Sequence, residues 1–490
     1  MDESGEKFGE HNPLKDSTIS NWQSIPADLL YVITDLCLAA KRDFDPKLLM
    51  QVCRHWNSVL MSMESLWCKI LVAHPTVYAN QRRMSEFEIC HTPAELQKAL
   101  DRTTGEIIEL TCRFDSSEWA GTAGTDSSSN TPQGLIDVIR TSNSSLRIRR
   151  LRIDSDSSRL MERIDFDSLE FPALEEAILV MSSSGLTKRI QVTSPRLRYL
   201  RLYEDTNINL NWDLSKMTAP FTLELIGNNE AIHERFHLRK ILSSIHHIVH
   251  LTLRTIRVFD GDYLTLPTLQ ILELVDTRLE FNLDLPSLIR LHLRESSIRT
   301  SESHPFVPPS LKTLELSNLE VENLLHIHVE SLETLEFFAF HDDDMLFIRM
   351  FIEQMVKPGY VRPRKLRFQY ITINSSLLTS ILHEVPDLVE LFIGECELGV
   401  QFFEAFAGCS LPAGPDSSQQ QPILPSLQTF KLRIHHNQPA SQAESDMINW
   451  LTWTVEARSK AGYPVKAALR ATFDGGWIPV GSHHHSGMAT

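Results

Sequence analysis

The residues whose types and spacing could hold a metal ion are histidines. His326 and His328 are one residue apart, so in a strand both rings would project from the same face and could ligate a metal, but no third ligand is evident beside them. The alternative is a surface pair. His341 precedes three aspartates at 342–344, which either bind a cation or begin a helix. We therefore predict no metal site.

Linear signatures of catalysis are missing from the sequence. There is no nucleophile elbow, Walker loop, dinucleotide fingerprint or zincin helix. We predict that the chain has no catalytic residues, takes no cofactor and is not an enzyme. An active site without a linear signature is the remaining alternative, and it would require a deep pocket with convergent ionisable groups.

Composition and charge limit the class of protein. The 490 residues are 42% hydrophobic and 22% charged, so we expect most of the chain to fold. A formal net charge of −16 argues against nucleic acid as a partner, because neutralising phosphates requires a basic surface. We find no secretion signal and no uncharged run long enough for a membrane, and the seven cysteines have no CxxC pair. These features predict a cytoplasmic or nuclear protein with reduced thiols.

A helical segment over 21–72 is the first ordered element that we expect. Pro26 suits the first turn of a helix, and apolar residues at helical spacing run from Leu29 to Cys37. A second apolar series at helical spacing runs from Leu48 to Met63. So short a segment carries more apolar surface than it can bury alone, which predicts a partner or a neighbouring domain.

The order of these residues resembles the F-box, the motif by which substrate receptors of ubiquitin ligases bind the Skp adaptor. Ile25-Pro26 comes first, then the series from Leu49 to Trp56, and then Trp67. The alternative is an ordinary helical cap on a larger domain. The resemblance implies that the adaptor is bound by Ile25, Pro26, Leu29, Leu30, Ile33, Leu49, Val52, Trp56, Leu66 and Trp67.

A periodic apolar pattern fills the middle of the chain. Four copies of the spacing Leu-x-x-Leu-x-apolar have central leucines at Leu272, Leu291, Leu314 and Leu335, separated by 19, 23 and 21 residues. This period is typical of leucine-rich repeats, in which each unit supplies one strand and a return segment. Weaker copies begin at Ile148 and continue to the last one, Leu427-x-x-Phe430-x-Leu432.

The predicted fold is α/β: an N-terminal helical F-box followed by an irregular leucine-rich-repeat solenoid, with parallel strands on the concave side and helices and loops on the convex side. We expect a disordered N-terminus over 1–20, the F-box-like domain over 21–72, the repeat domain over 90–475 and a flexible tail over 476–490. Compositional breaks near 116–134 and 411–425 predict inserted loops. Thr277 and Ser296 are expected to satisfy turning backbone groups through their hydroxyls.

One surface of the repeats is the predicted site of recognition. In such an array, the residues between the framework leucines project from the strands to the concave side. The alternative is a solvated sheet face. Their mixed charge suits a protein segment, and the candidate substrate-binding residues are Arg254, Glu273, His292, Arg294, Glu315, Glu336 and Phe338.

With an F-box-like helical segment followed by periodic leucines, the chain resembles F-box proteins with leucine-rich repeats. The resemblance implies a substrate-recognition subunit of a SKP–cullin–F-box ubiquitin ligase, which binds the Skp adaptor, and through it a cullin scaffold, at one end and a protein substrate of unknown identity on the repeats. The alternative is a non-catalytic scaffold of the same architecture that does not direct ubiquitination. No membrane partner is expected.

Overall fold

The structure, a computed structural model, describes most of the chain and divides it into two compact units. The units are residues 1–174 and 175–490. The described residues are 25–40, 46–63, 67–74, 88–103, 105–114, 132–156, 170–181, 194–203, 219–227, 242, 247–258, 263–279, 282–298, 305–319, 327–329, 331–340, 345–355, 362–371, 375–394, 398–409, 421–433, 442–470 and 477–480. The predicted ranges 1–20 and 116–131 lie outside them.

The first unit begins with three helices and continues as a small α/β layer. The helices are α1 (Ala27–Ala40), α2 (Pro46–Met50) and α3 (Arg54–Ser62). They are followed by β1 (Lys69–Val72), β2 (Glu88–Cys90), α4 (Pro93–Arg102), β3 (Ile108–Phe114), α6 (Pro132–Thr141), the 3-10 turn η6 (Ser144–Arg147) and β4 (Ile148–Ser155). Helix α6 begins inside the loop predicted over 116–134, because Leu135, Ile136 and Ile139 are buried.

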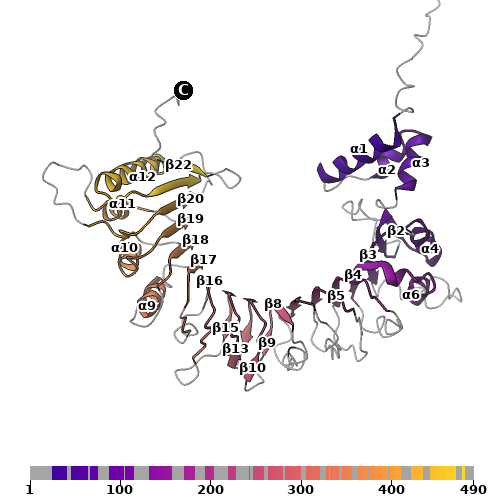
Figure 1. Cartoon of the computed structure of the whole chain (residues 1–490), viewed down its shortest axis with the longest axis horizontal. Coiled ribbons are helices and arrows are strands. Elements are labelled where there is room, and N and C mark those ends of the chain that lie inside the picture. The colour runs from indigo at the N-terminus through magenta and orange to yellow at the C-terminus, as the bar shows by residue number, and fades with distance from the viewer. Residues whose placement is uncertain are drawn as a thin grey trace, which may run out of the picture. The chain divides into compact units, whose positions relative to one another are not determined.

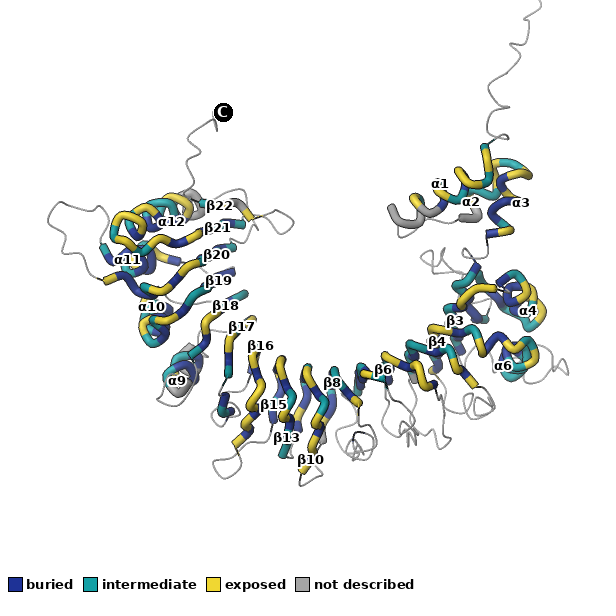
Figure 2. Tube along the Cα trace, viewed as in Figure 1, coloured by how far each residue is buried: buried dark blue, intermediate teal, exposed yellow. Residues whose placement is uncertain are grey.

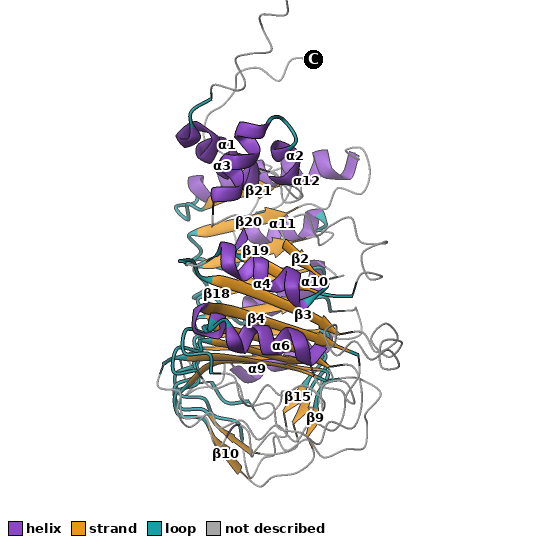
Figure 3. Ribbon diagram, turned by 90° about the vertical axis from the view of Figure 1, so that its right-hand side faces the viewer, coloured by secondary structure: helices purple, strands orange, loops and turns teal. Residues whose placement is uncertain are grey.

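The sheet of the first unit is parallel. Strand β1 lies between β2 and β3, and β3 pairs with β4. Figure 3 looks onto α4 and α6, which cover one face of these strands. The spacing Thr92-x-x-Glu95 predicts a capping box, and both hydrogen bonds of that box are present at the start of α4. Strand β1, which directly follows the helical segment, thus pairs with strands on both sides, and these elements all belong to the unit of residues 1–174.

The second unit is built on a long sheet whose strands are parallel except at one edge. Each strand pairs with the next, and β22 at the end runs antiparallel to β21. In order these strands are β5 (Glu176–Met181), β6 (Tyr199–Tyr203), β7 (Phe221–Ile226), β8 (Ile248–Arg254), β11 (Ile271–Val275), β14 (Arg290–Arg294), β16 (Thr313–Ser317), β17 (Thr334–Phe338), β18 (Lys365–Gln369), β19 (Glu390–Gly394), β20 (Thr429–Arg433), β21 (Lys466–Arg470) and β22 (Ile478–Val480).

Short strands and helices cover one face of this sheet. Strands β9 (Arg257–Val258), β12 (Arg278–Leu279) and β15 (Ser297–Ile298) form a second parallel sheet, and β10 (Tyr263–Thr265) pairs with β13 (Asn282–Asp284). Helices α9 (Met345–Met355), α10 (Ser375–His383), α11 (Val400–Ala407) and α12 (Gln442–Lys460) lie beside β17 to β21 (Figure 1). Within the described residues no helix covers the opposite face, which we call the open face.

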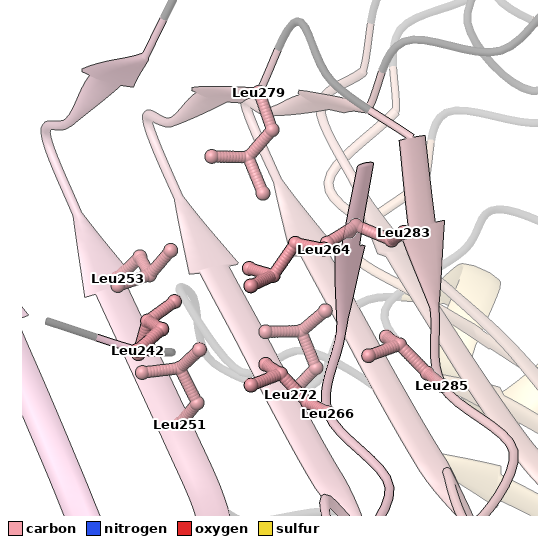
Figure 4. A pocket seen from close by; sticks show the side chains of 9 residues that line it. All are labelled: Leu242, Leu251, Leu253, Leu264, Leu266, Leu272, Leu279, Leu283 and Leu285. Atoms are coloured by element: carbon pink, nitrogen blue, oxygen red, sulfur yellow. The ribbon is translucent and has the colours of Figure 1, made fainter. Parts of the chain in front are cut away.

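The period of the leucines places one strand beside the next in register. Leu272, Leu291, Leu314 and Leu335 are successive cross-strand partners, and all are buried. Side chains alternate along each strand, so the leucines pack beneath the sheet and the residues between them reach the open face. Figure 2 shows buried residues alternating with more exposed ones along these strands. Figure 4 shows leucines of β8 and β11 directed toward those of β10 and β13, leaving a cavity of about 10 Å³. That space is too small for a ligand.

Two strands, β7 and β18, were not predicted individually. Both keep the central leucine and the next apolar residue, Leu223 with Leu225 and Leu366 with Phe368, and all four are buried. The first apolar position of the spacing is proline in each, Pro220 and Pro363. Proline lacks an N–H group but lies just before the strand, where no ladder hydrogen bond is lost. A repeat pattern that allows proline at this first position would have predicted both strands.

Turns of the same kind follow six consecutive strands, β8, β11, β14, β16, β17 and β18. The residue directly after each strand has a left-handed backbone: Thr255, Asp276, Glu295, Asn318, Ala339 and Tyr370, with φ between 44° and 55°. The side chains predicted to satisfy these turns do so, because the Thr277 hydroxyl donates to the Val275 carbonyl at 2.9 Å and the Ser296 hydroxyl accepts from the Thr277 N–H at 3.0 Å.

The structure describes parts of the loop and of the tail that are predicted near the end of the chain. Within the loop predicted over 411–425, residues 411–420 lie outside the described residues, whereas Ile423 and Leu424 are buried. Within the tail predicted over 476–490, β22 pairs with β21, and the Trp477 ring lies 5.8 Å from the Phe392 ring. These two segments are held by burial and by strand pairing, which local composition does not reveal.

Candidate functional site

The helical segment of the first unit has a core of its own, made by two adjoining clusters. Leu30, Trp56 and Val59 form one, and Leu60, Met63 and Trp67 form the other, with Tyr31 and Leu49 packed against both. The Trp67 indole N–H donates to the Leu60 carbonyl at 3.0 Å. A ring nitrogen of His55 lies 3.0 Å from the Ile25 carbonyl, which ties the start of the segment to α3.

Large apolar side chains remain on the surface of the same segment. Leu29, Val32 and Leu36 of α1 are 54%, 53% and 63% exposed. Their spacing of three and four residues places them on one side of the helix. Leu48 and Val52, near α2, are 59% and 49% exposed. We call the row on α1 (Leu29, Val32 and Leu36) the α1 stripe.

This arrangement restricts the predicted adaptor-binding set. Leu30, Trp56 and Trp67 are 0%, 4% and 3% exposed, so in this conformation they stabilise the helical segment and their side chains are not available to a partner. Pro26, Leu29 and Val52 are exposed, and Ile25, Ile33 and Leu49 are half-buried. Leu66 lies outside the described residues. Sequence reasoning did not select Val32, although the helical spacing from Leu29 could have identified it.

The second candidate surface is the open face of the second unit, where polar side chains stand in rows across the strands. All seven predicted substrate-binding residues lie there. Glu273, His292, Glu315 and Glu336 are successive cross-strand partners in the middle row. Arg254 and Arg294, in the next row, are both cross-strand partners of Val275, and Phe338 follows Ser317 there.

Ion pairs link the rows of the open face. Glu224, only 6% exposed, accepts from the Tyr199 hydroxyl at 2.7 Å and lies 2.6 Å from Arg201 and 3.2 Å from Arg254. His250 lies 3.5 Å from Glu273, and Arg290 lies 2.8 Å from Glu315. Burial, followed by the hydrogen bond to Glu224, raises the pKa of Tyr199 above its ordinary value. These groups are engaged with one another and do not converge on a cavity.

The middle row is partly desolvated. Burial lowers the pKa of His292, so this imidazole is neutral at pH 7 despite the carboxylates beside it. Burial, and then the negative charge of Glu315, raise the pKa of Glu336. The hydrogen bond from His250 lowers the pKa of Glu273. A partly buried row of carboxylates with one imidazole is suited to hydrogen-bonding a peptide, and no pair in it has the geometry of an acid and a base around a substrate.

The chain was compared with known proteins. No family model matches it, and no curated protein matches it significantly. The conclusions below therefore depend on the residues and their geometry.

Other chemistry was sought in the part of the chain that the structure describes. No group of three or more His, Cys, Asp or Glu side chains there could hold a metal ion. A notch lined by Pro220, His247, Thr268, Gln270 and Ser287 has one titratable side chain. Burial raises the pKa of the Cys112 thiol to about 12, so it is not a nucleophile at neutral pH. None of the helices described here is long and apolar enough to cross a bilayer.

The two histidine groupings that were weighed against a metal site lie largely outside the part of the chain that the structure describes. His326 and the acidic run 341–344 lie outside the described residues, and His328 is half-buried beside the isolated bridge between Phe306 and Ile327. The two exposed surfaces, the α1 stripe and the open face, are therefore the candidate functional sites.

Proposed function

We propose that this protein is the substrate-recognition subunit of a SKP–cullin–F-box ubiquitin ligase. On this proposal the helical segment is an F-box that binds the Skp adaptor, and the second unit is a leucine-rich-repeat solenoid whose open face takes a protein substrate. The chain itself performs no bond chemistry. It raises the effective concentration of substrate lysines near a ubiquitin-charged enzyme that the cullin scaffold brings.

The observation that carries the proposal is the α1 stripe. Helix α1 contains two charged residues, Asp28 and Asp35, in 14 positions, yet one side of it is exposed beside a complete core. Burying one of these three large aliphatic side chains against a partner would stabilise the complex by about 1.5–3 kcal/mol. A docking helix is the simplest reason for such a surface, and the F-box order of the residues indicates which partner it meets.

The organisation of the second unit supports the repeat assignment. One strand per period, a ladder of buried leucines and a repeated left-handed turn are the features that a stacked repeat requires. Each unit buries its leucines against the next, so the side chains between the leucines are left for binding.

Capture of a purified Skp adaptor tests the first half of the proposal. Leu29→Asp combined with Val32→Asp places two charges on the α1 stripe and leaves the core untouched, so we expect the parent to capture the adaptor and this variant to lose it by at least about tenfold. The matched control is Met350→Asp on α9, a 53% exposed apolar residue of the other unit, which should capture normally. Equal capture by the stripe variant and the parent would contradict the assignment.

Variants in the core would not test docking. Leu30→Ala or Trp56→Ala removes a buried side chain and destabilises the segment by about 2–5 kcal/mol, so loss of capture would have two explanations. The second half of the proposal is tested by the lifetime of the captured partners, which the protein should shorten in cells. Capture without a change in lifetime would favour the non-catalytic scaffold.

A further inference from the structure

The charge of the open face changes along the second unit. On β18 to β21 the twelve open-face positions hold six cations, Lys365, Arg367, Lys431, Arg433, Lys466 and Arg470, and one carboxylate, Glu390, a formal charge of +5. We call these six residues the basic patch. The chain as a whole carries −16, so chance alone would not favour such a cluster.

Glu390 cannot compensate the basic patch. It lies 3.2 Å from Lys431, 3.9 Å from Lys365 and 3.9 Å from Arg367, so one carboxylate is shared by three cations. Arg367 also lies 3.6 Å from Glu336 on β17. The three cations that share Glu390 keep 35–47% of their side chains exposed. The patch therefore attracts anions, and its side chains remain within reach of a ligand.

Aromatic side chains border the basic patch. The rings of Phe338 and Tyr370 lie 4.9 Å apart and are 37% and 38% exposed. The Arg433 guanidinium lies over the Tyr370 ring at 5.9 Å, which joins this pair to the cations. On β22's side, Trp477 is 38% exposed and packs edge-on against Phe392. Exposed rings beside cations form a surface that takes apolar and acidic groups together.

Gly394 brings the Phe392 ring close to the backbone between these groups. It stands in the row between Gln369 and Arg433, so no side chain separates Arg433 from Tyr370. A Cβ atom at Gly394 would lie 3.0 Å from the Phe392 ring, which shows that the ring leans over the glycine. The Phe392 ring therefore occupies the place that a side chain at position 394 would take.

We propose that the basic patch binds an extended acidic segment of a partner protein, with Asp or Glu side chains against the cations and one aromatic or aliphatic side chain on the Phe338–Tyr370 pair. This inference rests on the proposed function and names its substrate class. The distance from β17 to β21 is about 19 Å, which about six extended residues span. A peptide is favoured over a nucleic acid because Glu390 and Glu336 lie within the surface and would repel a continuous phosphate backbone.

Peptide binding to the full-length protein tests the inference. The probe is a fluorescent peptide of about ten residues with several Asp and Glu side chains and one Phe, measured by anisotropy. We expect binding that weakens with salt, that is lost when Gln and Asn replace the acids, and that weakens when Ala replaces Phe. A single-stranded oligonucleotide that binds more tightly than the peptide, or a phosphoserine peptide that binds while the Asp/Glu peptide does not, would overturn the proposal.

Substitutions in the basic patch show whether the peptide binds there. Arg433→Gln with Arg470→Gln should weaken binding by about tenfold or more, since two charges are removed from the patch. Lys365→Gln with Lys466→Gln removes two other cations of the patch and should weaken binding in the same direction even if the arginine variant fails to fold. The matched control, Arg349→Gln with Lys460→Gln, removes two cations from helices α9 and α12, away from the open face, and should change binding less than about twofold. Equal affinity in the parent and in both patch variants would overturn the proposal.

The outcome is independent of adaptor docking. Peptide binding should persist in the Leu29→Asp, Val32→Asp variant even if that variant or the parent captures no adaptor. Failure of the ligase assignment therefore leaves this test unaffected, and failure of peptide binding leaves the adaptor test unaffected.

Discussion

At the scale of single residues, Arg458 of α12 is a buried cation whose hydrogen-bond partners are backbone carbonyls instead of a carboxylate. It is completely buried, and its guanidinium donates to the carbonyls of Phe406, Ile423 and Leu424 at 2.8–2.9 Å. Burial lowers its pKa to about 10, so it stays charged at neutral pH. The Phe406 carbonyl belongs to the last turn of α11, where a cation is favourable. Arg458 therefore joins α11, α12 and the segment 421–424.

We predict that Arg458→Met destabilises the second unit by about 3 kcal/mol or more, because three buried carbonyls lose their donors. Arg458→Lys should recover only part of this loss, since an ammonium cannot reproduce the planar arrangement of the donors. Urea unfolding monitored by tryptophan fluorescence provides the measurement. Arg349→Met is the control: it breaks an ion pair of two side chains that are each over 40% exposed, and should cost less than about 1 kcal/mol. Equal unfolding midpoints for the two variants would contradict this role.

At the scale of elements, the left-handed turn that follows six consecutive strands is the repeated feature of the second unit. The N–H of the turn residue donates to the last carbonyl of the next strand, as from Thr255 to Val275 and from Ala339 to Gln369, at 2.8–2.9 Å. The left-handed conformation costs a residue with a Cβ atom about 1–2 kcal/mol. Five of the six positions nevertheless carry side chains larger than alanine, so cross-strand bonding and packing must offset this strain.

Ala339 is the position where the strain can be tested with the least change in contacts. We predict that Ala339→Gly, at φ 55°, is neutral or stabilises by up to about 1 kcal/mol, because glycine relieves the strain and loses only one methyl group. Ala468→Gly, in the middle of β21, should instead destabilise by about 0.5–1 kcal/mol. Thermal unfolding of the two variants gives the comparison. Equal destabilisation by the two substitutions would contradict the idea that the turn at Ala339 is strained.

At the scale of the whole molecule, the two compact units each have a core and each carry one of the candidate surfaces. The α1 stripe belongs to residues 1–174, and the basic patch belongs to residues 175–490. Substitutions at sites that belong to different cores are expected to behave additively. On the proposed function the protein only holds its two partners, so binding of one partner need not change the affinity for the other.

We therefore predict that the affinity for the acidic peptide changes less than about twofold when the Skp adaptor is saturating. Likewise, Arg433→Gln with Arg470→Gln should not alter adaptor capture, and Leu29→Asp with Val32→Asp should not alter peptide binding. Anisotropy titrations with and without the adaptor measure the coupling. A change of tenfold or more in either affinity would show that the two units are linked.

The sequence by itself determined the periodic part of this protein. Leucines about 20 residues apart predicted the parallel strands and their partners, and Thr92 with Glu95 predicted the start of α4. These features depend on local spacing, because side chains alternate along a strand and caps act within one turn. The candidate substrate-binding residues followed from the same alternation.

Only the tertiary structure decided which side of α1 is covered, since apolar residues occur on more than one side and only packing selects Leu30 over Leu29. It also decided the contacts of Arg458, the pairing of β22 and the gathering of six cations on β18 to β21. Each of these joins residues far apart in the chain, and spacing along the sequence carries no information about such distances. Periodicity determines what repeats locally, whereas burial and charge clustering arise when distant segments meet.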